Sequence, residues 1–491
     1  PRPGQSWILR ELSGEGTAER SNAQFKSLIA KGQQGLDVIG DSPTMAMLDP
    51  DHPHAEHAVG TQGVSLCCRA DYEMLYRDLP LDSLSFSQSL PSVAAIGGLY
   101  LVATGRGVAA DKLRGSAIQV ALYEDDCCYS RHLPLALRTR LATDSIAFAT
   151  EKMPKFHALL EDTYYFSESG LESVEEMALG FVELRFYIRA LIERGIDVDA
   201  FAPRIGILLT CRMDLFEEIA KIRASRRLYA RMMKEEFGAR DARSMALTVT
   251  AHTSGLTMTA QQPVNNVARG GMQALAMALA GVQAMEVSTF DEAYRTPSAE
   301  AHLVGLRTQQ IVQLETNVTK VADPLGGSYY VEALTDEMER RIAAEVVRIE
   351  AAGDIAELAE QGYFRRIFVN AMERLGRDLA DGTLQRVGDT CHTVPEDEDR
   401  MLKDAAERKI EPCHEQIDRI RDFKCSRDQN RVKQALGALH DAARDESCNL
   451  MVSYIAALTA DATVGETAGV LRQAYGQAYD PLAGLPSPLD G

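Results

Sequence analysis

The stretch IGILLTCRMDLFEEIAKIRASRRLYARMMKEEFG, residues 205–238, decides the fold because it joins two hydrophobic patterns. Residues 205–210 are a short apolar run, which is typical of a strand buried on both faces. Residues 214–237 repeat apolar side chains at helical spacing, and Gly238 follows them, as glycine often does where a helix ends. The stretch therefore predicts a strand followed by a helix, the unit from which parallel α/β folds are built.

The same unit recurs along the first two thirds of the chain. Amphipathic helical segments separate eight predicted strands, at residues 36–39, 84–89, 117–122, 156–160, 205–210, 245–252, 284–288 and 320–322. Eight strands alternating with helices are what a parallel (β/α)8 TIM barrel requires. We therefore expect an α/β fold with a barrel over residues 1–385. A helical C-terminal region is expected over residues 386–491, with a polar surface excursion at 387–401.

Composition excludes several classes of protein. No run of about 18 apolar residues occurs, and the N-terminus lacks the layout of a signal peptide. Nine cysteines without a C-x-x-C motif fit reduced thiols, so a cytoplasmic location is expected. The formal charge of −19 argues against nucleic acid or an anionic membrane as a partner.

Common site motifs are absent from the sequence. It contains neither G-x-G-x-x-G, a P-loop nor a G-x-S-x-G elbow. The segment DHPHAEH, residues 51–57, brings His52, His54 and His57 together, but at a spacing unlike that of known zinc motifs. A transition-metal site there is one interpretation. A solvated loop is the favoured one, so no metal site is predicted.

Four later segments carry a specific resemblance. They are TSGLTMTAQQPVNNVARG (253–270), STFDEAYRTPSAEA (288–301), RTQQIVQLET (307–316) and VTKVADPLGGSYYVEALTDEME (318–339). Together they resemble the large chain of the methylmalonyl-CoA mutase family, whose members are adenosylcobalamin-dependent carbon-skeleton mutases. The resemblance covers nearly the whole chain and is strongest from about residue 196 onward. It implies a barrel with cobalamin over its C-terminal face and an acyl-CoA substrate threading its axis.

The resemblance also bears on partners. The family's cobalamin-ligand motif D-x-H-x-x-G is missing from this sequence. The resemblance then implies a separate small cobalamin-binding subunit, as in the isobutyryl-CoA and 2-hydroxyisobutyryl-CoA mutases, and a dimer of the large chain. The alternative is that no cobalamin binds.

Site residues can be carried over position by position. Gln119 matches a substrate-orienting glutamine, and Arg10 matches the arginine of the family's first motif. Tyr165 or Tyr164 stands where the family has the histidine that bonds the thioester carbonyl, and His252 is a candidate acid or base. The resemblance assigns a further set to the cofactor side, namely Glu168, Arg269, Glu315, Asp323, Gly326 and Gly327.

The departures fall where substrate is expected. Leu12 replaces a family tyrosine, and Tyr129 aligns near the arginine that grips the methylmalonyl carboxylate, so methylmalonyl-CoA is not expected as the substrate. Glu286 replaces a histidine. The barrel mouth is expected to be rich in acidic residues, namely Glu124, Asp125, Asp126, Glu161, Asp162 and Glu286. These carboxyl groups could bind a cationic group, or their mutual repulsion could raise their pKa values for proton transfer. The alternative is that they face solvent. Bulky apolar residues in FHALLED and GILLTC are expected to narrow the barrel axis.

Three functions follow from these patterns. The leading hypothesis is the large subunit of an adenosylcobalamin-dependent mutase, an isomerase, acting on an unusual acyl-CoA-type substrate. The second hypothesis is a protein with the same fold but without radical chemistry, either a repurposed enzyme or an inactive partner subunit. The third is a helical binding module that uses the C-terminal helices.

Overall fold

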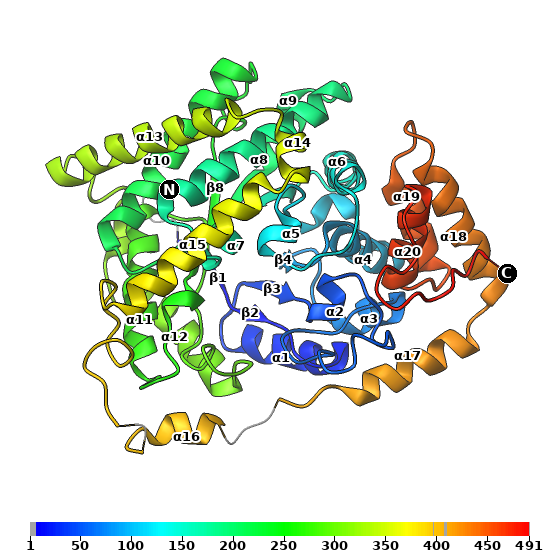
Figure 1. The fold of residues 1–491 in the computed structure, drawn as a ribbon, viewed down its shortest axis with the longest axis horizontal. Helices are drawn as coiled ribbons and strands as arrows, with labels where there is room; N and C mark the ends of the chain where they lie inside the picture. Colours follow the sequence, from blue (N-terminus) through cyan, green and yellow to red (C-terminus); the bar gives the residue numbers. More distant parts are fainter. Residues whose placement is uncertain (1–5, 396, 407–409, 491) are drawn as a thin grey trace.

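The computed structural model describes residues 6–395, 397–406 and 410–490, with only the backbone for residues 404–406. Its centre is one parallel sheet that closes into a barrel (Figure 1). The strands are β1 (Ile8–Arg10), β2 (Leu12–Ser13), β3 (Gly35–Ile39), β4 (Ser85–Ser89), β5 (Arg114–Gln119), β6 (Phe156–Asp162), β7 (Ile205–Cys211), β8 (Thr248–Thr253) and β9 (Ala284–Glu286). Glu11 alone separates β1 from β2. Because β1 pairs with β9 and β2 pairs with β3, this N-terminal stretch closes the sheet.

Seven of the eight predicted strands are present, and the eighth prediction is wrong. Lys320 ends a short 3-10 helix, Val318–Lys320, and no strand forms at residues 321–322. The missing strand is instead the N-terminal stretch Ile8–Ser13. Its side chains alternate, with Arg10 lining a cavity inside the barrel and Glu11 accepting a hydrogen bond from Gln309 on the outside. The TIM barrel predicted from the strand count is confirmed, although one strand was placed at the wrong end of the chain.

Helices surround the barrel as the strand–helix alternation predicts. The long ones are α1 (Ala18–Ala30), α4 (Ser92–Gly105), α6 (Leu135–Lys152), α8 (Ser173–Glu193), α10 (Leu215–Arg231), α11 (Asn265–Ala280) and α12 (Ala299–Leu314). Short helices sit in the connections: α2 (Ser42–Met45), α3 (Arg69–Leu75), α5 (Glu124–Cys127), α7 (Tyr164–Glu168) and α9 (Val198–Phe201). The α10 helix starts where the Asp214 side chain accepts a bond from the Glu217 amide. A π-helical turn, Met232–Glu236, continues it toward Gly238, whose φ is +67°.

Three helices after the barrel extend this layer: α13 (Tyr329–Glu350), α14 (Ile355–Glu360) and α15 (Tyr363–Ala380). The α15 helix runs across the C-terminal ends of β5 and β6, in front of the barrel in Figure 1. Its Phe364 and Phe368 pack against Tyr123, and Phe368 also meets Phe166 next to β6. Arg374 pairs with Glu175 at the start of α8, so this side of the barrel mouth is covered.

The remaining helices are α16 (Arg400–Ala406), α17 (His414–Ser426), α18 (Gln429–Ala443), α19 (Leu450–Thr459) and α20 (Val464–Ala474). In Figure 1, α17 to α20 lie on the opposite side of the barrel from α10 and α13. Arg140 of α6 donates to the carbonyls of Ala442 and Ala443, and Asp144 accepts from the amide of Leu450, so α6 anchors α18 and α19. None of the described helices is long and apolar enough to cross a bilayer.

Candidate active site

Three carboxyl side chains gather inside the barrel near the C-terminal ends of its strands. Asp37 comes from β3, Asp162 ends β6 and Glu286 ends β9, and each is 1% exposed. We call these three residues the acid cluster. Ser89, which ends β4, donates to Asp37 at 3.2 Å. Catalytic groups of TIM barrels collect at this end of the strands, so the acid cluster is the natural centre of a site.

Burial changes the protonation of the acid cluster. Burial and then repulsion from Asp37, with which it shares a hydrogen bond, raise the pKa of Glu286 well above its usual value. Burial also raises the pKa of Asp162 to about 8. Oxygen Oε1 of Glu286 has no hydrogen-bond partner among the described residues. Asp162 is therefore largely protonated at neutral pH, and burial disfavours the charged form of Glu286.

His252 of β8 faces the same group. Its Nδ1 lies 2.7 Å from the carbonyl oxygen of Thr253, which fixes the proton on Nδ1. Its Nε2 lies 3.8 Å from Oε2 of Glu286, and the ring of Tyr164 packs edge-on at a centroid distance of 4.8 Å. Burial lowers the pKa of His252, so the ring is neutral and Nε2 is a proton acceptor. This is the arrangement that an acid or base at this position needs.

Tyr164 and Tyr165 begin α7, directly after β6. Asp162 accepts a bond from the amide of Tyr165 at 3.4 Å and so helps to start this helix. Burial raises the pKa of both tyrosines, so both phenols remain protonated donors. Thr163, the residue before them, donates to Glu176 at 3.0 Å, which ties the strand end to α8.

A buried lysine supports these strand ends, and the sequence analysis did not single it out. Nζ of Lys221 on α10 lies 2.8 Å from Glu176, 2.7 Å from Glu218 and 2.7 Å from the carbonyl oxygen of Thr210. Glu176 in turn bonds Thr163. The signal in the sequence was a lysine at an apolar-face position of α10, three residues after Glu218.

The opposite end of the barrel opens into a cavity of about 680 Å³. Its lining combines hydroxyl groups with basic side chains, chiefly Arg10, Ser85, Arg114, Ser116, Lys155, His157, Arg204 and Thr250. Arg10 donates to Ser85 at 2.7 Å, and Ser116 donates to Ser87 at 3.0 Å. The expected narrowing of the barrel axis by apolar residues is therefore partial. Leu160 of β6 lines the cavity, while β4 and β5 supply small polar side chains. One end of the barrel is basic and the other acidic.

Two predicted site residues lie outside the barrel wall. Gln119 donates to Ser145 of α6 and to the carbonyl oxygen of Ala158. Glu161 faces α8, where its carboxyl group interacts with Glu183. Because neighbouring strand residues point to opposite faces, Asp162 faces inward and Glu161 cannot. Neither residue joins the acid cluster.

Two others lie near the barrel's C-terminal opening. Leu12 and His252 both line a cavity of about 470 Å³ there. Tyr129 follows α5 and hydrogen-bonds Ser42 at the start of α2. Leu12 and His252 therefore line the same cavity, while Tyr129 contacts the start of α2.

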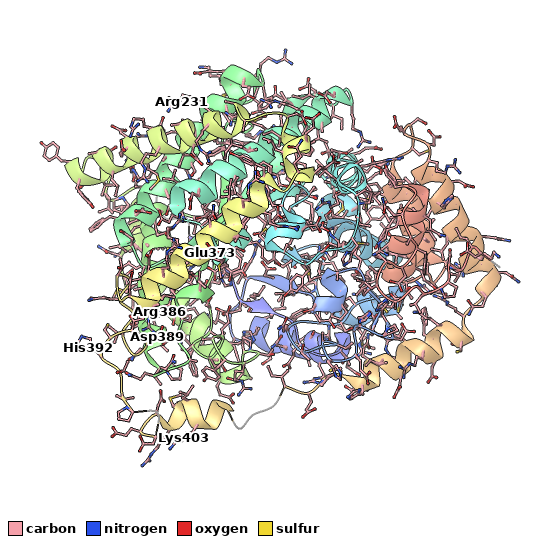
Figure 2. The ribbon with its side chains drawn as sticks, in the orientation of Figure 1. Arg231, Glu373, Arg386, Asp389, His392 and Lys403 are labelled. Atoms are coloured by element: carbon pink, nitrogen blue, oxygen red, sulfur yellow. The ribbon has the colours of Figure 1, made fainter. Side chains whose placement is uncertain are left out.

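The residues assigned to the cofactor separate into two groups. Glu168 accepts from Ser254 Oγ at 2.7 Å and from the amide of Leu256 at 2.6 Å, beyond β8. Arg269 of α11 donates to Thr259 and to the carbonyl oxygen of Val387. A nearby cavity of about 750 Å³ lies on this face of the barrel, lined by Arg212, Asp214, Leu256, Thr257, Arg269, Met272 and Arg386 among others. Figure 2 shows Arg386 with Asp389 on the loop that follows α15.

The second group lies on the outer helical layer. Glu315 is exposed just after α12, and Asp323 pairs with Arg223 of α10. The amide of Gly327 donates to Glu332 of α13 at 2.9 Å. The turn needs left-handed backbone at Asp323 (φ +49°) and Gly327 (φ +85°), and Gly326 lies between them. The strand predicted at residues 320–322 does not form, so Asp323, Gly326 and Gly327 do not follow the end of a barrel strand.

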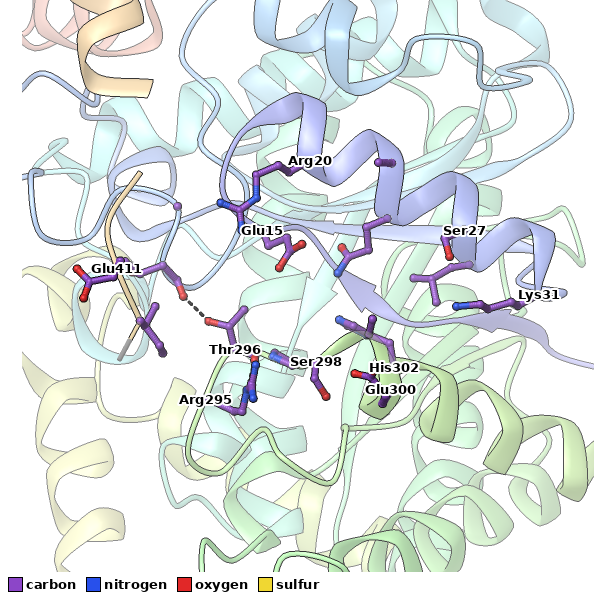
Figure 3. A pocket seen from close by; sticks show the side chains of 18 residues that line it. Glu15, Arg20, Ser27, Lys31, Arg295, Thr296, Ser298, Glu300, His302 and Glu411 are labelled. Carbon is purple, nitrogen blue, oxygen red and sulfur yellow. Dashed lines mark hydrogen bonds between the residues drawn. The ribbon is translucent and has the colours of Figure 1, made fainter. Parts of the chain in front are cut away.

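Two further places in the molecule bring polar side chains together. His52 pairs with buried Asp480 at 3.3 Å, so the solvated-loop interpretation is wrong for this histidine. A groove of about 750 Å³ runs between α1 and the segment before α12 (Figure 3). There Thr296 donates to the carbonyl oxygen of Thr61, while Arg20 faces it from α1. None of the residues predicted for the site lines this groove.

Buried titratable groups at the C-terminal ends of the strands are typical of TIM-barrel enzymes, whose active sites lie at this face. The sequence profile of methylmalonyl-CoA mutase matches residues 3–477. The chain therefore belongs to the methylmalonyl-CoA mutase family, whose mutases are isomerases. It is 35% identical over 96% of its length to the 2-hydroxyisobutanoyl-CoA mutase large subunit of Aquincola tertiaricarbonis, and covers 84% of that protein. It is 34% identical to a methylmalonyl-CoA mutase of Rhizobium meliloti and 32% identical to that of Escherichia coli, spanning about two thirds (66%) of each.

Proposed function

We propose that the chain is the substrate-binding large subunit of an adenosylcobalamin-dependent mutase that rearranges the acyl group of a CoA thioester other than methylmalonyl-CoA. Its activity would be an intramolecular 1,2-shift. Family membership supports the reaction class. The opposite charges at the two ends of the barrel support the substrate class and its orientation.

The basic end suits the phosphates of CoA. Arg114, Lys155 and Arg204 surround the opening at the N-terminal ends of the strands. Guanidinium groups bind phosphate with charge-assisted hydrogen bonds. The hydroxyl-lined cavity behind them suits the polar, narrow pantetheine chain. The acyl group would then lie at the acid cluster.

The residues at the acyl end have distinct tasks in this proposal. Tyr165 or Tyr164 donates a hydrogen bond to the thioester carbonyl oxygen, which a protonated phenol can do. His252 accepts a proton through Nε2. Asp37, Asp162 and Glu286 offer no cation that could pair with a second carboxylate on the acyl group. A methylmalonyl group is disfavoured on this ground.

The C-terminal face of the barrel fits a large cofactor. The buried Nε of Arg212 has no partner within the described part of the chain, and Arg212 lines the cavity beside Leu256 and Met272. An apolar wall with an open donor suits a macrocycle that carries amide side chains. Glu168 and Arg269 would hold the surrounding loops. When bound, the cofactor supplies the radical that starts the shift, and the protein orients the acyl group and excludes water.

The cobalamin-binding part is assigned to a separate small subunit. The large-subunit name of the Aquincola relative implies such a partner for that protein. The test combines the chain with adenosylcobalamin and the cobalamin-binding small subunit from the same organism. We expect binding of CoA thioesters and, with the right thioester, an EPR signal from a cobalamin-coupled radical. Thioester binding without any radical would overturn the mutase assignment, and absence of thioester binding would overturn the substrate class.

A further inference from the structure

The cavity at the N-terminal end of the barrel contains three buried polar atoms that the described part of the chain leaves without a hydrogen-bond partner. They are Nε of Arg10 on β1, Nδ1 of His157 on β6 and Oγ1 of Thr250 on β8. All three side chains line this one cavity. A buried polar atom without a partner is costly, so three of them in one cavity indicate that a ligand completes them.

Two glycines keep space open beside two of these atoms. Gly206 on β7 pairs in the sheet with Leu160, which lines the cavity, so Gly206 faces the cavity as well. A Cβ at Gly206 would lie 3.8 Å from Nδ1 of His157, and a Cβ at Gly35 would lie 3.0 Å from Nε of Arg10. A ligand can therefore approach both atoms where side chains would otherwise stand.

His157 offers the cavity an acceptor and not a donor. Burial lowers the pKa of His157 to about 4, so its ring is neutral at pH 7 and carries one N–H. The ring also forms a hydrogen bond with the backbone of Arg204, and this bond favours the protonated ring, so the ring donates and the carbonyl oxygen accepts. Nδ1, the nitrogen without a partner, therefore keeps its lone pair.

Arg10 and Thr250 offer donors. Nη2 of Arg10 donates to Ser85 at 2.7 Å, which fixes the guanidinium group and leaves Nε–H as a buried donor without an acceptor. The hydroxyl group of Thr250 can donate or accept. Thr250 precedes His252 by two residues on β8, so it faces the same side of the sheet, on the order of 7 Å nearer the N-terminal end of the strand.

We propose that Arg10, His157 and Thr250 hold the pantetheine arm of the CoA thioester by its two amide groups, with Nδ1 of His157 accepting from the amide N–H farther from the thioester. This proposal rests on the function proposed above. Nε of Arg10 and the hydroxyl group of Thr250 donate to the amide carbonyl oxygens. His157 takes the farther amide because it stands at the start of β6, beside the basic opening, whereas the acyl group would lie at the opposite ends of the strands.

Other ligand groups match these three atoms less well. A phosphate group offers mainly acceptor oxygens near neutral pH, and the lone pair of Nδ1 would repel them. An alkyl chain would leave all three atoms without a partner. An amide group has both an N–H donor and a carbonyl acceptor, which is the combination that one bare acceptor and two donors require.

The test is calorimetric titration of the full chain with free CoA, which has the complete pantetheine arm and does not depend on the identity of the acyl group. The comparison ligand is a CoA analogue in which an ester oxygen replaces the amide N–H farther from the thiol. We expect the ester analogue to bind about tenfold or more weakly than CoA, because it leaves the buried Nδ1 of His157 without a donor.

Variants identify the residues that contact the amide groups. His157→Phe should bind CoA and the ester analogue equally, because the acceptor that distinguishes them is gone, and His157→Met is the second variant if His157→Phe fails to fold. The matched control is Lys155→Ser at the basic opening, which should weaken both ligands by the same factor and keep the preference for CoA. Thr250→Val should weaken both ligands about threefold or more, because both keep the carbonyl oxygens.

The possible failures can be told apart. Equal binding of CoA and the ester analogue by the wild type, or an unchanged preference in the His157 variants, would overturn the assignment of the amide N–H and leave the proposed function standing. Unchanged affinities in Thr250→Val would overturn the part of the proposal that concerns the carbonyl oxygens. No binding of CoA or of any CoA thioester would overturn both this proposal and the proposed substrate class.

Discussion

Replacing Lys221 with methionine tests the support beneath the site. Lys221 is fully buried and ion-pairs with Glu176 and Glu218, while its third hydrogen bond reaches the carbonyl oxygen of Thr210 at the end of β7. Burial alone would lower the pKa of Lys221, but the two carboxylates outweigh it and raise the pKa. Methionine keeps most of the volume but leaves two buried carboxyl groups without a cation.

The expected loss follows from this geometry. Removing one partner of a buried ion pair costs about 3–5 kcal/mol, because the remaining charge stays buried. The entropy of unfolding is about 2.1 cal/mol/K per residue, so a chain of 491 residues that unfolds as one unit has roughly 1 kcal/mol/K. The melting temperature of Lys221→Met should therefore fall by about 3–5 °C at pH 7.5.

The assay is calorimetry or thermal fluorescence between pH 5 and 8. Burial raises the pKa of Glu218 and Lys221 opposes that rise, so without Lys221 the pKa of Glu218 rises further. The penalty is present above that pKa and fades as the pH falls. The loss of melting temperature should therefore shrink toward pH 5. Adding Glu218→Gln to Lys221→Met should recover part of that loss. Lys152→Met, at an exposed pair with Glu151, should leave the melting temperature unchanged. A Lys221→Met protein that melts within about 1 °C of the wild type at pH 7.5 would refute the reasoning.

Three further predictions concern the barrel wall and its two ends. Gly115→Ala should lower the melting temperature by about 3 °C or more, because the new Cβ would lie 1.9 Å from the carbonyl oxygen of Phe86 and Gly115 has a φ of +144°. Gly105→Ala is the control and should leave the melting temperature unchanged, because the space around Gly105 is open. Burial raises the pKa of Asp162 to about 8, so its contribution to stability is present below about pH 4 and is lost as the pH rises to 8. The melting temperature of Asp162→Asn should therefore rise relative to that of the wild type between pH 5 and pH 8, as measured by thermal scans. Arg114→Ser should weaken CoA binding about fivefold or more at low salt and reduce its salt dependence, as measured by titration.

Most of the barrel could be predicted from the sequence because its inner strands are apolar runs separated by amphipathic helices. The closing strand could not. Residues Ile8–Ser13 read ILRELS, which has only three apolar side chains, and Arg10 points into the barrel. Arg10 on the inner face and Glu11 on the outer face interrupt the apolar run, so the stretch lacks the pattern of a buried strand. The strand predicted at 320–322 failed because its short apolar run belongs to a turn stabilised by Arg223 and Glu332.

The residue types of the site could be predicted from the sequence, but the side of the barrel wall on which each side chain lies could not. Asp162, His252 and Glu286 were all singled out, and the strand register brings them to one end of the barrel. Glu161 was singled out with equal weight, but alternation sends it outward. The register between β5 and β6 shifts, because the step from Ser116 to Ile118 on β5 spans the three-residue step from His157 to Leu160 on β6. The extra residue in β6 moves every later side chain of that strand to the other face, so the sequence alone could not decide between Glu161 and Asp162 as the inward residue.

The acid cluster also bears on whether the chain is an inactive scaffold. A buried acceptor without a partner costs about 1–3 kcal/mol, a sizeable part of a protein's net stability. In a scaffold with no ligand to bind, substitution by apolar or amide residues would remove that cost. The cost is instead placed at the C-terminal strand ends, where barrel enzymes work, with His252 and two protonated tyrosines beside it. The opposite, basic end of the barrel would attract phosphate, so the difference in charge between the two ends would fix the direction in which a CoA thioester enters.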